Sequence, residues 1–430
     1  KKSIYRMRLR YLLVSLIVWV GSRAEQSEDK TDTVSTLDTD RYSLPQDAHY
    51  VLYDVNRGEG FNLRRDVHMR MAIAVKKMRE KGVNAILVLP PWGGLYHWRD
   101  RKTGVRWSDL FDVPSLNSFV PSIEFDQFLE VSPSPIIDRL VYLQHFSEGW
   151  NGEYVMKSEK RPCTEGNQYY EKEDGLWKGW FYGSNEVRAR DLECISFQGD
   201  AETFSELLAK NYSTFQSIFV DRAETVLHAE YGGVEYWQAR RSMRYSKLLE
   251  ARAERFITDE MKEEIDAQPL TERWEDEEAS RASKGGAYVC AHWRRRDFVT
   301  SYGKTLPSIE GAAEQITELA RNYGVKKAFI ATDAPEKEIE QLRKLLKITV
   351  YTFRPDPEEK LIDGASAIVE QIICSWARAF TGSHVSTFSY RIQEDREIRG
   401  FPVETTFRRM CADDVRNFPC DQPAKWKIIY

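Results

Sequence analysis

A glutamate between two glycines is the residue of this chain best placed for acid–base chemistry. Residues 58–62 read GEGFN and follow the apolar run 50–53. The apolar run predicts a buried strand, and the two glycines permit positive φ angles and close approach of another molecule. A carboxylate in that loop could accept a proton from a ligand, because open α/β sheets bind ligands at the carboxyl ends of their strands. A tight turn with a solvated Glu59 explains the same residues equally well.

The glycines do not form a known phosphate-binding loop. A dinucleotide-binding loop needs a third glycine three residues after Gly60, where Leu63 stands, and a Walker loop needs Lys followed by Ser or Thr. The elements around Glu59 are nevertheless clear. Asn62 is a favourable helix N-cap, the apolar residues Val67, Met71, Ala74 and Met78 recur at helical spacing before Gly82, and residues 85–89 predict a second buried strand. The sequence therefore predicts one strand–helix–strand unit with Glu59 in its first loop.

A second group of candidate residues follows another predicted strand, residues 287–291. His292 comes first, and Trp293 is followed by three arginines and Asp297. Guanidinium groups bind phosphate through paired hydrogen bonds and stay protonated, so an arginine can neutralise a diphosphate without metal. Three adjacent arginines cannot all face one ligand, and we assign the phosphate to Arg294, with Asp297 paired to one of the three. An ordinary ion-pair cluster is the alternative.

Three hydroxyl residues, Ser386, Thr387 and Ser389, precede or begin a predicted helix at residues 390–398. Hydroxyl and backbone N–H groups at a helix start favour phosphate binding, and N-capping accounts for only one of the hydroxyls. Asp333 ends a predicted strand and could accept a hydrogen bond from a base or ribose. Phe353 could stack on the base.

The order of predicted elements gives the fold class. Strands at 287–291, 327–332 and 348–353 alternate with helices at 309–323, 336–346 and 365–380. Such alternation predicts a mainly parallel sheet covered by helices. Helices across 203–256 would close the first series, and the acidic, turn-rich segment 263–286 would separate the two. We therefore predict a GT-B glycosyltransferase fold of the α/β class, with two Rossmann-like domains, 45–262 and 287–430, facing each other across a cleft.

Composition narrows the function. The 62 basic and 67 acidic residues nearly balance, which argues against general nucleic-acid binding. No metal site is predicted, because no two of the seven histidines lie within five residues of each other and the cysteines lack zinc-ligand spacing. An acid pair, Asp38 and Asp40, lies in a segment without rigid support, so we do not assign it a metal.

The first 24 residues have the form of a secretory signal, with basic residues before an apolar run at 11–20 and small residues before a cleavage point after Ala24. A short signal anchor is the alternative. Residues 25–44 predict a disordered linker. No later segment is apolar for long enough to span a membrane, so no stable membrane span is predicted.

The cysteines and one sequon fit the secretory pathway. Cys163 and Cys194, and likewise Cys411 and Cys420, lie in polar, loop-like sequence, and we predict that each pair forms a disulfide. Cys290 and Cys374 lie in apolar runs and are predicted to be buried free thiols. Asn211 begins an N-glycosylation sequon. The first disulfide would pin residues 148–193, an aromatic-rich segment that either recognises an acceptor or is a structural insertion.

The motifs in this order resemble the protein O-fucosyltransferase family. They are residues 58–62, 161–163, 231–233, 292–295, 331–333, 386–389 and 426–428, and the resemblance extends from about residue 50 to residue 430. It implies a GT-B enzyme of the endoplasmic reticulum lumen, without a required cofactor, that transfers fucose with inversion from GDP-fucose to Ser or Thr of folded thrombospondin type 1 repeats.

Roles follow from the matching motifs. Glu59 would be the general base, Asn62 would position donor and acceptor, and Arg294 would stabilise charge on the β-phosphate as GDP leaves. The other residues assigned to GDP-fucose are Gly58, Gly60, Phe61, His292, Asp333, Phe353, Ser386, Thr387 and Phe388. The alternatives are fucose transfer to epidermal growth factor repeats, and a GDP-sugar-dependent chaperone without turnover.

Three residues depart from the family pattern. Arg57 replaces an expected Pro and would loosen the loop before Glu59. Trp293 replaces a smaller aliphatic residue and would add bulk near the phosphate. Glu370 replaces Asp and lengthens a carboxylate side chain. None of the three removes a proposed catalytic group.

Overall fold

The computed structural model describes residues 37, 48–95, 98, 104–149, 154–164, 169–278, 280–415, 420, 422 and 427–430. They belong to one compact unit, Ser35–Tyr430. The predicted signal sequence, the Asp38 and Asp40 pair and nearly all of the predicted linker lie outside the described residues. Leu37, within that linker, is buried in an apolar cluster that also contains Tyr50 and Ile86. This one residue of the linker therefore packs against the first sheet.

The first sheet is organised around β1 (His49–Tyr53), the strand that precedes Glu59. β1 pairs in parallel with β2 (Ala85–Leu89) and β9 (Ser217–Asp221). Across the sheet the order is β3 (Ser122–Glu124), β2, β1, β9, β4 (Ile136–Gln144), β8 (Arg188–Asp200), β7 (Leu176–Lys178) and β6 (Glu171–Glu173), while β5 (Lys157–Lys160) and β10 (Val226–Leu227) also pair with β8. Every pair from β3 to β8 is parallel, and the hairpin strands β6 and β7 pair antiparallel.

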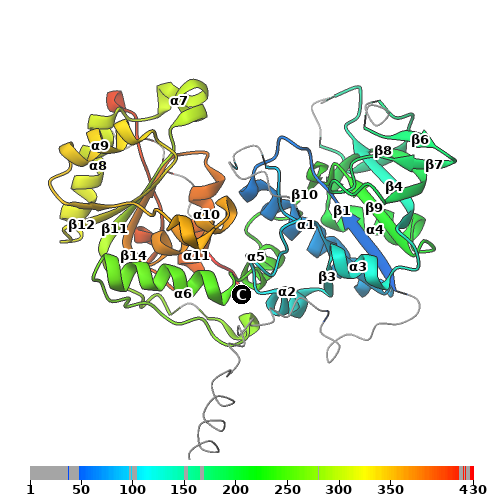
Figure 1. The fold of residues 1–430 in the computed structure, drawn as a ribbon, viewed down its shortest axis with the longest axis horizontal. Helices are drawn as coiled ribbons and strands as arrows, with labels where there is room; N and C mark the ends of the chain where they lie inside the picture. Colours follow the sequence, from blue (N-terminus) through cyan, green and yellow to red (C-terminus); the bar gives the residue numbers. More distant parts are fainter. Residues whose placement is uncertain are drawn as a thin grey trace, which may run out of the picture. The chain divides into compact units, whose positions relative to one another are not determined.

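Helix α1 (Phe61–Glu80) connects β1 to β2 and covers one face of this sheet (Figure 1). All four of its predicted core residues are buried, namely Val67, Met71, Ala74 and Met78. Val51 and Tyr53 of β1 belong to the apolar cluster with α1, whereas Tyr50 and Leu52 belong to a second cluster. Alternate strand residues face opposite sides, so β1 is buried on both faces, as is typical of a parallel sheet.

Five further α-helices lie between β2 and the second sheet in the described sequence, and the last of them, α6, packs against α10 (Asp363–Ser375) of the second sheet. They are α2 (Val113–Phe119), α3 (Phe125–Val131), α4 (Ala201–Asn211), α5 (Val234–Ser242) and α6 (Lys247–Arg255). The prediction of helices throughout 203–256 was wrong, because β9 and β10 lie between α4 and α5. β9 has only five residues, too few for helix and strand periods to be told apart.

The second sheet is entirely parallel. Its order is β13 (Thr349–Tyr351), β12 (Lys327–Thr332), β11 (Gly286–Trp293), β14 (Ala377–Gly382) and β15 (Arg408–Arg409). Its helices are α7 (Arg296–Tyr302), α8 (Ile309–Asn322), α9 (Glu336–Leu345), α10 (Asp363–Ser375), α11 (Thr387–Ile398) and α12 (Val403–Thr406). Helices α8 and α9 lie on one side of β11 and β12, and α10 and α11 on the other (Figure 1).

One predicted helix of this part is really a helix followed by a strand. Residues 365–380 were expected to be helical, but α10 ends at Ser375 and β14 begins at Ala377. β14 is buried beside β11 inside the sheet, and its apolar residues follow those of α10 with no Gly or Pro between the two elements. Periodicity alone could not separate the two elements.

Three disulfides are present. The predicted Cys163–Cys194 and Cys411–Cys420 pairs are confirmed. The prediction that Cys290 and Cys374 are free thiols was wrong, because they form a third disulfide with their Cα atoms 5.1 Å apart. Cys290 on β11 faces α10, which packs on that side of the sheet. Apolar surroundings indicated burial correctly, but they do not distinguish a thiol from a disulfide.

A single apolar cluster and a polar network join the two sheets. The cluster contains Val51 of β1 and Tyr288 of β11. In the network, Arg240 on α5 donates to Glu394 and Asp395 on α11, at 2.6 and 2.5 Å, and all three side chains are buried. Tyr236 also donates to Glu394. The boundaries at 262 and 286 stay a prediction. No helix in the described ranges is long and apolar enough to cross a membrane.

Candidate active site

The loop that carries Glu59 is a turn between β1 and α1. The Glu59 N–H donates to the carbonyl of Asn56 at 2.9 Å, and Gly60 is the N-cap of α1, with φ −79° and ψ 169°. Glycines permit positive φ, but neither Gly58 nor Gly60 adopts it. The glycines therefore leave space instead of relieving strain, and a Cβ at Gly58 would contact nothing within 4 Å.

The Glu59 side chain is half-buried and forms no hydrogen bond or ion pair with the described part of the chain. Burial raises the pKa of Glu59, and the nearby carboxylate of Glu224 raises it further. Arg64, Arg70 and Arg222 lower this pKa and oppose the shift. A carboxylate with a raised pKa and no partner is a better general base than an ion-paired one, because it binds a proton more readily.

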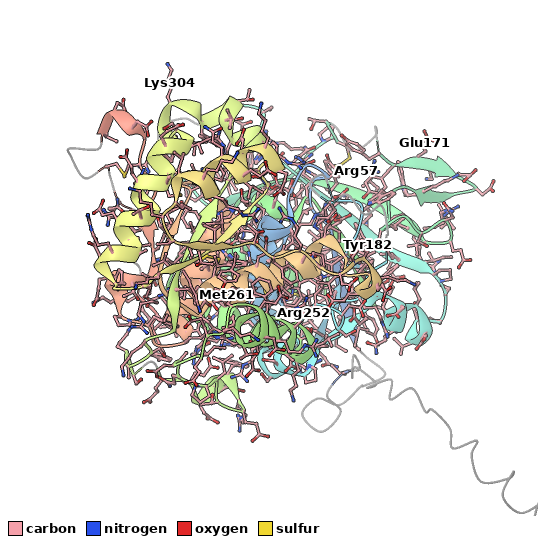
Figure 2. All side chains as sticks on the ribbon, turned by 60° about the vertical axis from the view of Figure 1, so that its left-hand side comes forward. Arg57, Glu171, Tyr182, Arg252, Met261 and Lys304 are labelled. Carbon is pink, nitrogen blue, oxygen red and sulfur yellow. A yellow bond between two sulfur atoms is a disulfide. The ribbon has the colours of Figure 1, made fainter. Side chains whose placement is uncertain are left out.

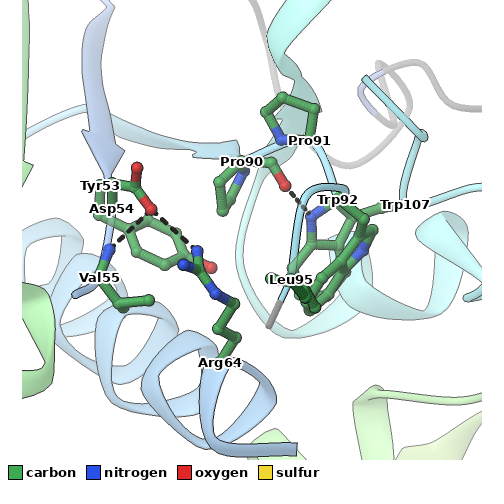
Figure 3. Close-up of a pocket in the computed structure, with 9 residues that line it drawn as sticks. All are labelled: Tyr53, Asp54, Val55, Arg64, Pro90, Pro91, Trp92, Leu95 and Trp107. Carbon is green, nitrogen blue, oxygen red and sulfur yellow. Dashed lines mark hydrogen bonds and ion pairs between the residues drawn. The ribbon is translucent and has the colours of Figure 1, made fainter. Parts of the chain in front are cut away.

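A small open pocket lies beside this loop, at the carboxyl ends of β1 and β2 (Figure 3). It is lined by Tyr53, Asp54, Val55, Arg64, Pro90, Pro91, Trp92, Leu95 and Trp107. Glu59 is not among them. Phe61, assigned to the donor, packs against Trp92 at 4.9 Å between ring centroids and is 7% exposed. The pocket therefore lies at the carboxyl ends of the strands, where a ligand was expected, and next to the loop of Glu59.

Asn62 links the first part of the chain to the second. Its amide oxygen accepts from Gln371 on α10 at 2.9 Å and from Arg65 at 3.3 Å, and Arg65 also donates to Gln371 at 2.8 Å. The predicted N-cap role was wrong, because α1 begins at Phe61 and Asn62 lies inside its first turn. The tertiary hydrogen bond uses the oxygen that a cap would have used.

His292 is buried at the end of β11. Its Nδ1 lies 2.8 Å from the Ser389 hydroxyl, and its ring stacks on Phe388 with centroids 4.3 Å apart. Burial, with a smaller effect of Arg294, lowers the pKa of His292 to about 3. The imidazole is therefore neutral at physiological pH, and one ring nitrogen can donate while the other accepts.

Arg294 is the arginine of the cluster that joins several predicted site residues. Its Nη1 lies 2.5 Å from the Asp333 carboxylate, its Nη2 donates to Asp297 at 2.6 Å, and its backbone N–H donates to the Ser383 hydroxyl at 3.0 Å. Arg295 instead donates to Glu338 at 2.7 Å. The expectation that Asp297 pairs with one of the arginines is confirmed, and the partner is Arg294 itself.

The residues at the start of α11 are close to this group. Ser386 is the N-cap of α11, and its hydroxyl makes no capping bond. Thr387 is the first helical residue, and Phe388 stacks on His292. The structure thus brings His292 and Phe388 together, while the hydroxyls of Ser386 and Thr387 bond to no described residue. Helix N-termini with free donors suit a phosphate.

Phe353 packs among other residues. It is 2% exposed, with Phe256 at 5.6 Å between ring centroids and the guanidinium of Arg252 at 5.0 Å. Its stacking on a base stays a prediction. The expected effect of Trp293 was wrong, because this side chain points away from His292 into the apolar cluster with α8 and α9 and is 1% exposed. Neighbouring strand residues face opposite sides, so its bulk enters the core.

Sequence reasoning missed several residues around the site. Arg64 holds the Glu59 loop, Gln371 holds Asn62, and Ser383 holds the backbone of Arg294. No motif marked them, because Arg64 acts on the folded shape of a nearby loop, and Gln371 and Ser383 act on residues distant in the chain. Glu370, noted only as a departure, is half-buried; burial and the charge of Asp333 raise its pKa to about 8 against the opposing effect of Arg354. Within the described ranges, no three His, Cys, Asp or Glu side chains cluster as metal ligands.

Two mainly parallel sheets covered by helices, each with charged side chains at its strand ends, form the architecture of a GT-B glycosyltransferase. The model of the GDP-fucose protein O-fucosyltransferase family matches residues 50–399. The chain belongs to this family and is an enzyme of it. The GDP-fucose protein O-fucosyltransferase 2 of Caenorhabditis elegans is 46% identical over 420 residues, covering 96% of this chain and 98% of that protein. The Homo sapiens protein of the same name is 43% identical over 390 residues, covering 89% and 90%.

A solved structure shows the same fold. POFUT1 in complex with GDP-fucose aligns with a TM-score of 0.55 at 16% identity, covering 86% of this chain and 99% of that one. At this identity the likeness concerns the fold. The GT-B prediction made from the order of strands and helices is confirmed.

Proposed function

We propose that this enzyme transfers fucose from GDP-fucose, with inversion, to Ser or Thr of folded thrombospondin type 1 repeats. The names of the Caenorhabditis elegans and Homo sapiens relatives support the donor and the O-linked product. The acceptor class rests on the family resemblance of the motifs. Three disulfides and an exposed Asn211 at the end of α4 support folding in the secretory pathway, and we propose the endoplasmic reticulum lumen.

The observation that carries the proposal is a chain of contacts between the two candidate catalytic groups. Glu59 lies three residues before Asn62, which bonds to Gln371 on α10. The same helix carries Cys374, which is disulfide-bonded to Cys290 on β11. Arg294 follows Cys290 by four residues. The loop of the base and the strand end of the arginine are thus connected within one body.

In the proposed reaction, Glu59 removes the proton of the acceptor hydroxyl, and the hydroxyl oxygen attacks C1 of fucose from the face opposite the diphosphate. The new C1–O bond forms as the bond from C1 to the β-phosphate oxygen breaks, and GDP leaves with the bonding electron pair. A serine hydroxyl is a weak nucleophile until its proton has an acceptor, which is the contribution of Glu59.

Arg294 stabilises the charge that grows on the β-phosphate. Its guanidinium is paired with Asp297 and Asp333, and we propose that the diphosphate competes with these carboxylates for it. Fixed donors aimed at developing charge contribute most when they are already in place. The Ser386 and Thr387 hydroxyls and the N-terminus of α11 supply further donors, while His292, Asp333, Phe353 and Phe388 hold the nucleotide.

The acceptor assay tests this function. The enzyme is incubated with GDP-fucose or other GDP-sugars and with folded or reduced thrombospondin repeats, and GDP release and product mass are measured. We expect transfer from GDP-fucose to the folded repeat alone. Preferential transfer to a folded epidermal growth factor repeat would replace the acceptor assignment, and no GDP release with any acceptor would contradict the reaction.

A further inference from the structure

Arg64 on α1 forms hydrogen bonds with three residues of the loop that carries Glu59. The Arg64 Nε donates to the backbone carbonyl of Glu59 at 3.2 Å, and its Nη2 donates to the carbonyl of Asn56 at 3.3 Å. Its Nη1 donates to the carboxylate of Asp54 at 3.0 Å (Figure 3). A single side chain therefore touches the beginning, the middle and the end of the loop.

The two groups that fix the position of the Arg64 side chain are the carboxylate of Asp54 and the first turn of α1. Asp54 directly follows β1, is 5% exposed, and also accepts from the backbone N–H of Val55 at 2.8 Å. The backbone N–H of Arg64 donates to the carbonyl of Gly60 at 3.0 Å, so Arg64 belongs to the first turn of α1. The guanidinium is thus held between a buried carboxylate and a helix, and the loop is held by the guanidinium.

The remaining support of the loop is weaker. Asn56, Arg57 and Gly58 are exposed. The Asn56 N–H donates to Glu224 at 3.0 Å, and the guanidinium of Arg57 lies 4.6 Å from the ring of Trp180, on the side of the molecule that also carries Glu171 (Figure 2). Neither contact holds a backbone carbonyl. The Glu59 N–H donates to the Asn56 carbonyl within the turn, and Arg64 ties this carbonyl and that of Glu59 to α1.

We infer that Arg64 is the positioning residue of this enzyme, which fixes the Glu59 loop so that the carboxylate meets the acceptor hydroxyl. The inference rests on the proposed role of Glu59 as the base. A guanidinium suits the task because its donors lie in one rigid plane and point in several directions. A lysine has a point charge on a flexible chain and cannot bond to the three oxygens with the same geometry.

Arg64 also acts on Glu59 through its charge. The groups that face Glu59 are Glu224, which raises its pKa, and Arg64, Arg70 and Arg222, which lower it. Loss of the Arg64 charge should raise the pKa of Glu59 further. Because the base acts when it is ionised, the acid limb of the pH profile of kcat should then move to higher pH.

Two substitutions separate geometry from charge. Arg64→Lys keeps the charge and loses the planar group, so kcat should fall about tenfold to a hundredfold, as expected when a catalytic group is misplaced by about 1 Å, while the acid limb stays in place. Arg64→Gln loses both, so kcat should fall and the acid limb should move to higher pH. GDP affinity, measured by calorimetry, should change much less than kcat in both, because the side-chain hydrogen bonds of Arg64 within the described chain go to Asp54, Asn56 and Glu59 of the first part.

Arg79→Lys is the matched control. Arg79 lies at the other end of α1 and donates to Asn84 at 2.8 Å and to the carbonyl of Ala85 at 2.9 Å, so it is also an arginine that holds backbone. It should keep the wild-type kcat. The inference is overturned if Arg64→Lys keeps wild-type kcat, or if Arg79→Lys loses as much as Arg64→Lys. Arg64→Lys is the mildest change and decides the question should Arg64→Gln fail to fold.

A Glu59→Ala variant measured in parallel separates this inference from the proposed function. If Glu59→Ala turns over normally, the assignment of the base is wrong and Arg64 has nothing to position. If Glu59→Ala is inactive and Arg64→Lys is not impaired, only the positioning role of Arg64 is wrong.

Discussion

Removal of the buried Cys290–Cys374 disulfide should destabilise the protein more than removal of the Cys411–Cys420 disulfide, which closes a shorter loop. The two cysteines are separated by 84 residues, and those of the Cys411–Cys420 disulfide by 9. A disulfide restricts the unfolded chain in proportion to the logarithm of the loop that it closes. This relation gives about 4.5 kcal/mol for the longer loop and about 2.5 kcal/mol for the shorter one.

Burial adds to the difference in the same direction. Cys290 and Cys374 are fully buried, so alanine at both positions also removes packed atoms from the core. Cys411 and Cys420 are partly exposed. The double variants Cys290→Ala with Cys374→Ala, and Cys411→Ala with Cys420→Ala, therefore form a matched pair.

The assay is equilibrium unfolding in denaturant without reductant, followed by tryptophan fluorescence. We expect the Cys290 and Cys374 double variant to lose about 2 kcal/mol more unfolding free energy than the other variant. Equal losses, or a larger loss for the Cys411 and Cys420 variant, would refute the reasoning. Peptide mapping without reduction should also recover a peptide pair joined through Cys290 and Cys374, and detection of free thiols there would contradict the structure.

Three other predictions concern buried polar groups. His292 should show no titration by NMR between about pH 5 and 8, because its pKa is lowered to about 3; a midpoint near its ordinary value would contradict its burial. Burial and the charge of Asp54 raise the pKa of Asp221 to about 7, so the folded state binds a proton that the unfolded state has lost, and stability should fall as pH rises from about 4 to 7. Asp221→Asn should reduce that slope in denaturation measured across this range, and an unchanged slope would disprove the assignment. Arg240→Met should lower unfolding free energy by about 3 to 5 kcal/mol, since Glu394 and Asp395 would be left buried without their partner; a loss below about 1 kcal/mol would show that water replaces it.

The sequence predicted the elements whose residues show a clear period or are bounded by turn residues. The core face of α1 and the strand β2 match, and β12 matches its predicted bounds of 327–332. The errors occurred at β9 and β14. β9 is too short to show a period, and β14 is buried on both faces, so its apolar residues merged with those of α10.

The candidate site was predictable where residue chemistry coincides with a strand end. Arg294 directly follows the parallel strand β11, and Glu59 lies in the loop that follows the parallel strand β1. The contacts that position them could not be predicted, because they join residues distant in the chain: Asn62 bonds to Gln371, and Arg294 bonds to Asp333. Asn62 was predicted to be an N-cap from local preference, but its amide oxygen accepts from Gln371 instead. Tertiary hydrogen bonds of this kind leave no spacing in the sequence.

The central claim is that Glu59 takes the proton of the acceptor while Arg294 stabilises the leaving diphosphate. The most direct measurement is the rate of fucose transfer to a folded thrombospondin repeat by Glu59→Ala, at saturating GDP-fucose, with GDP affinity measured on the same preparation. The account predicts that transfer falls by about 10² to 10⁴ while GDP affinity and secretion are retained. Arg294→Ala, measured beside it, should lose transfer as well. Near wild-type turnover by Glu59→Ala would contradict the account.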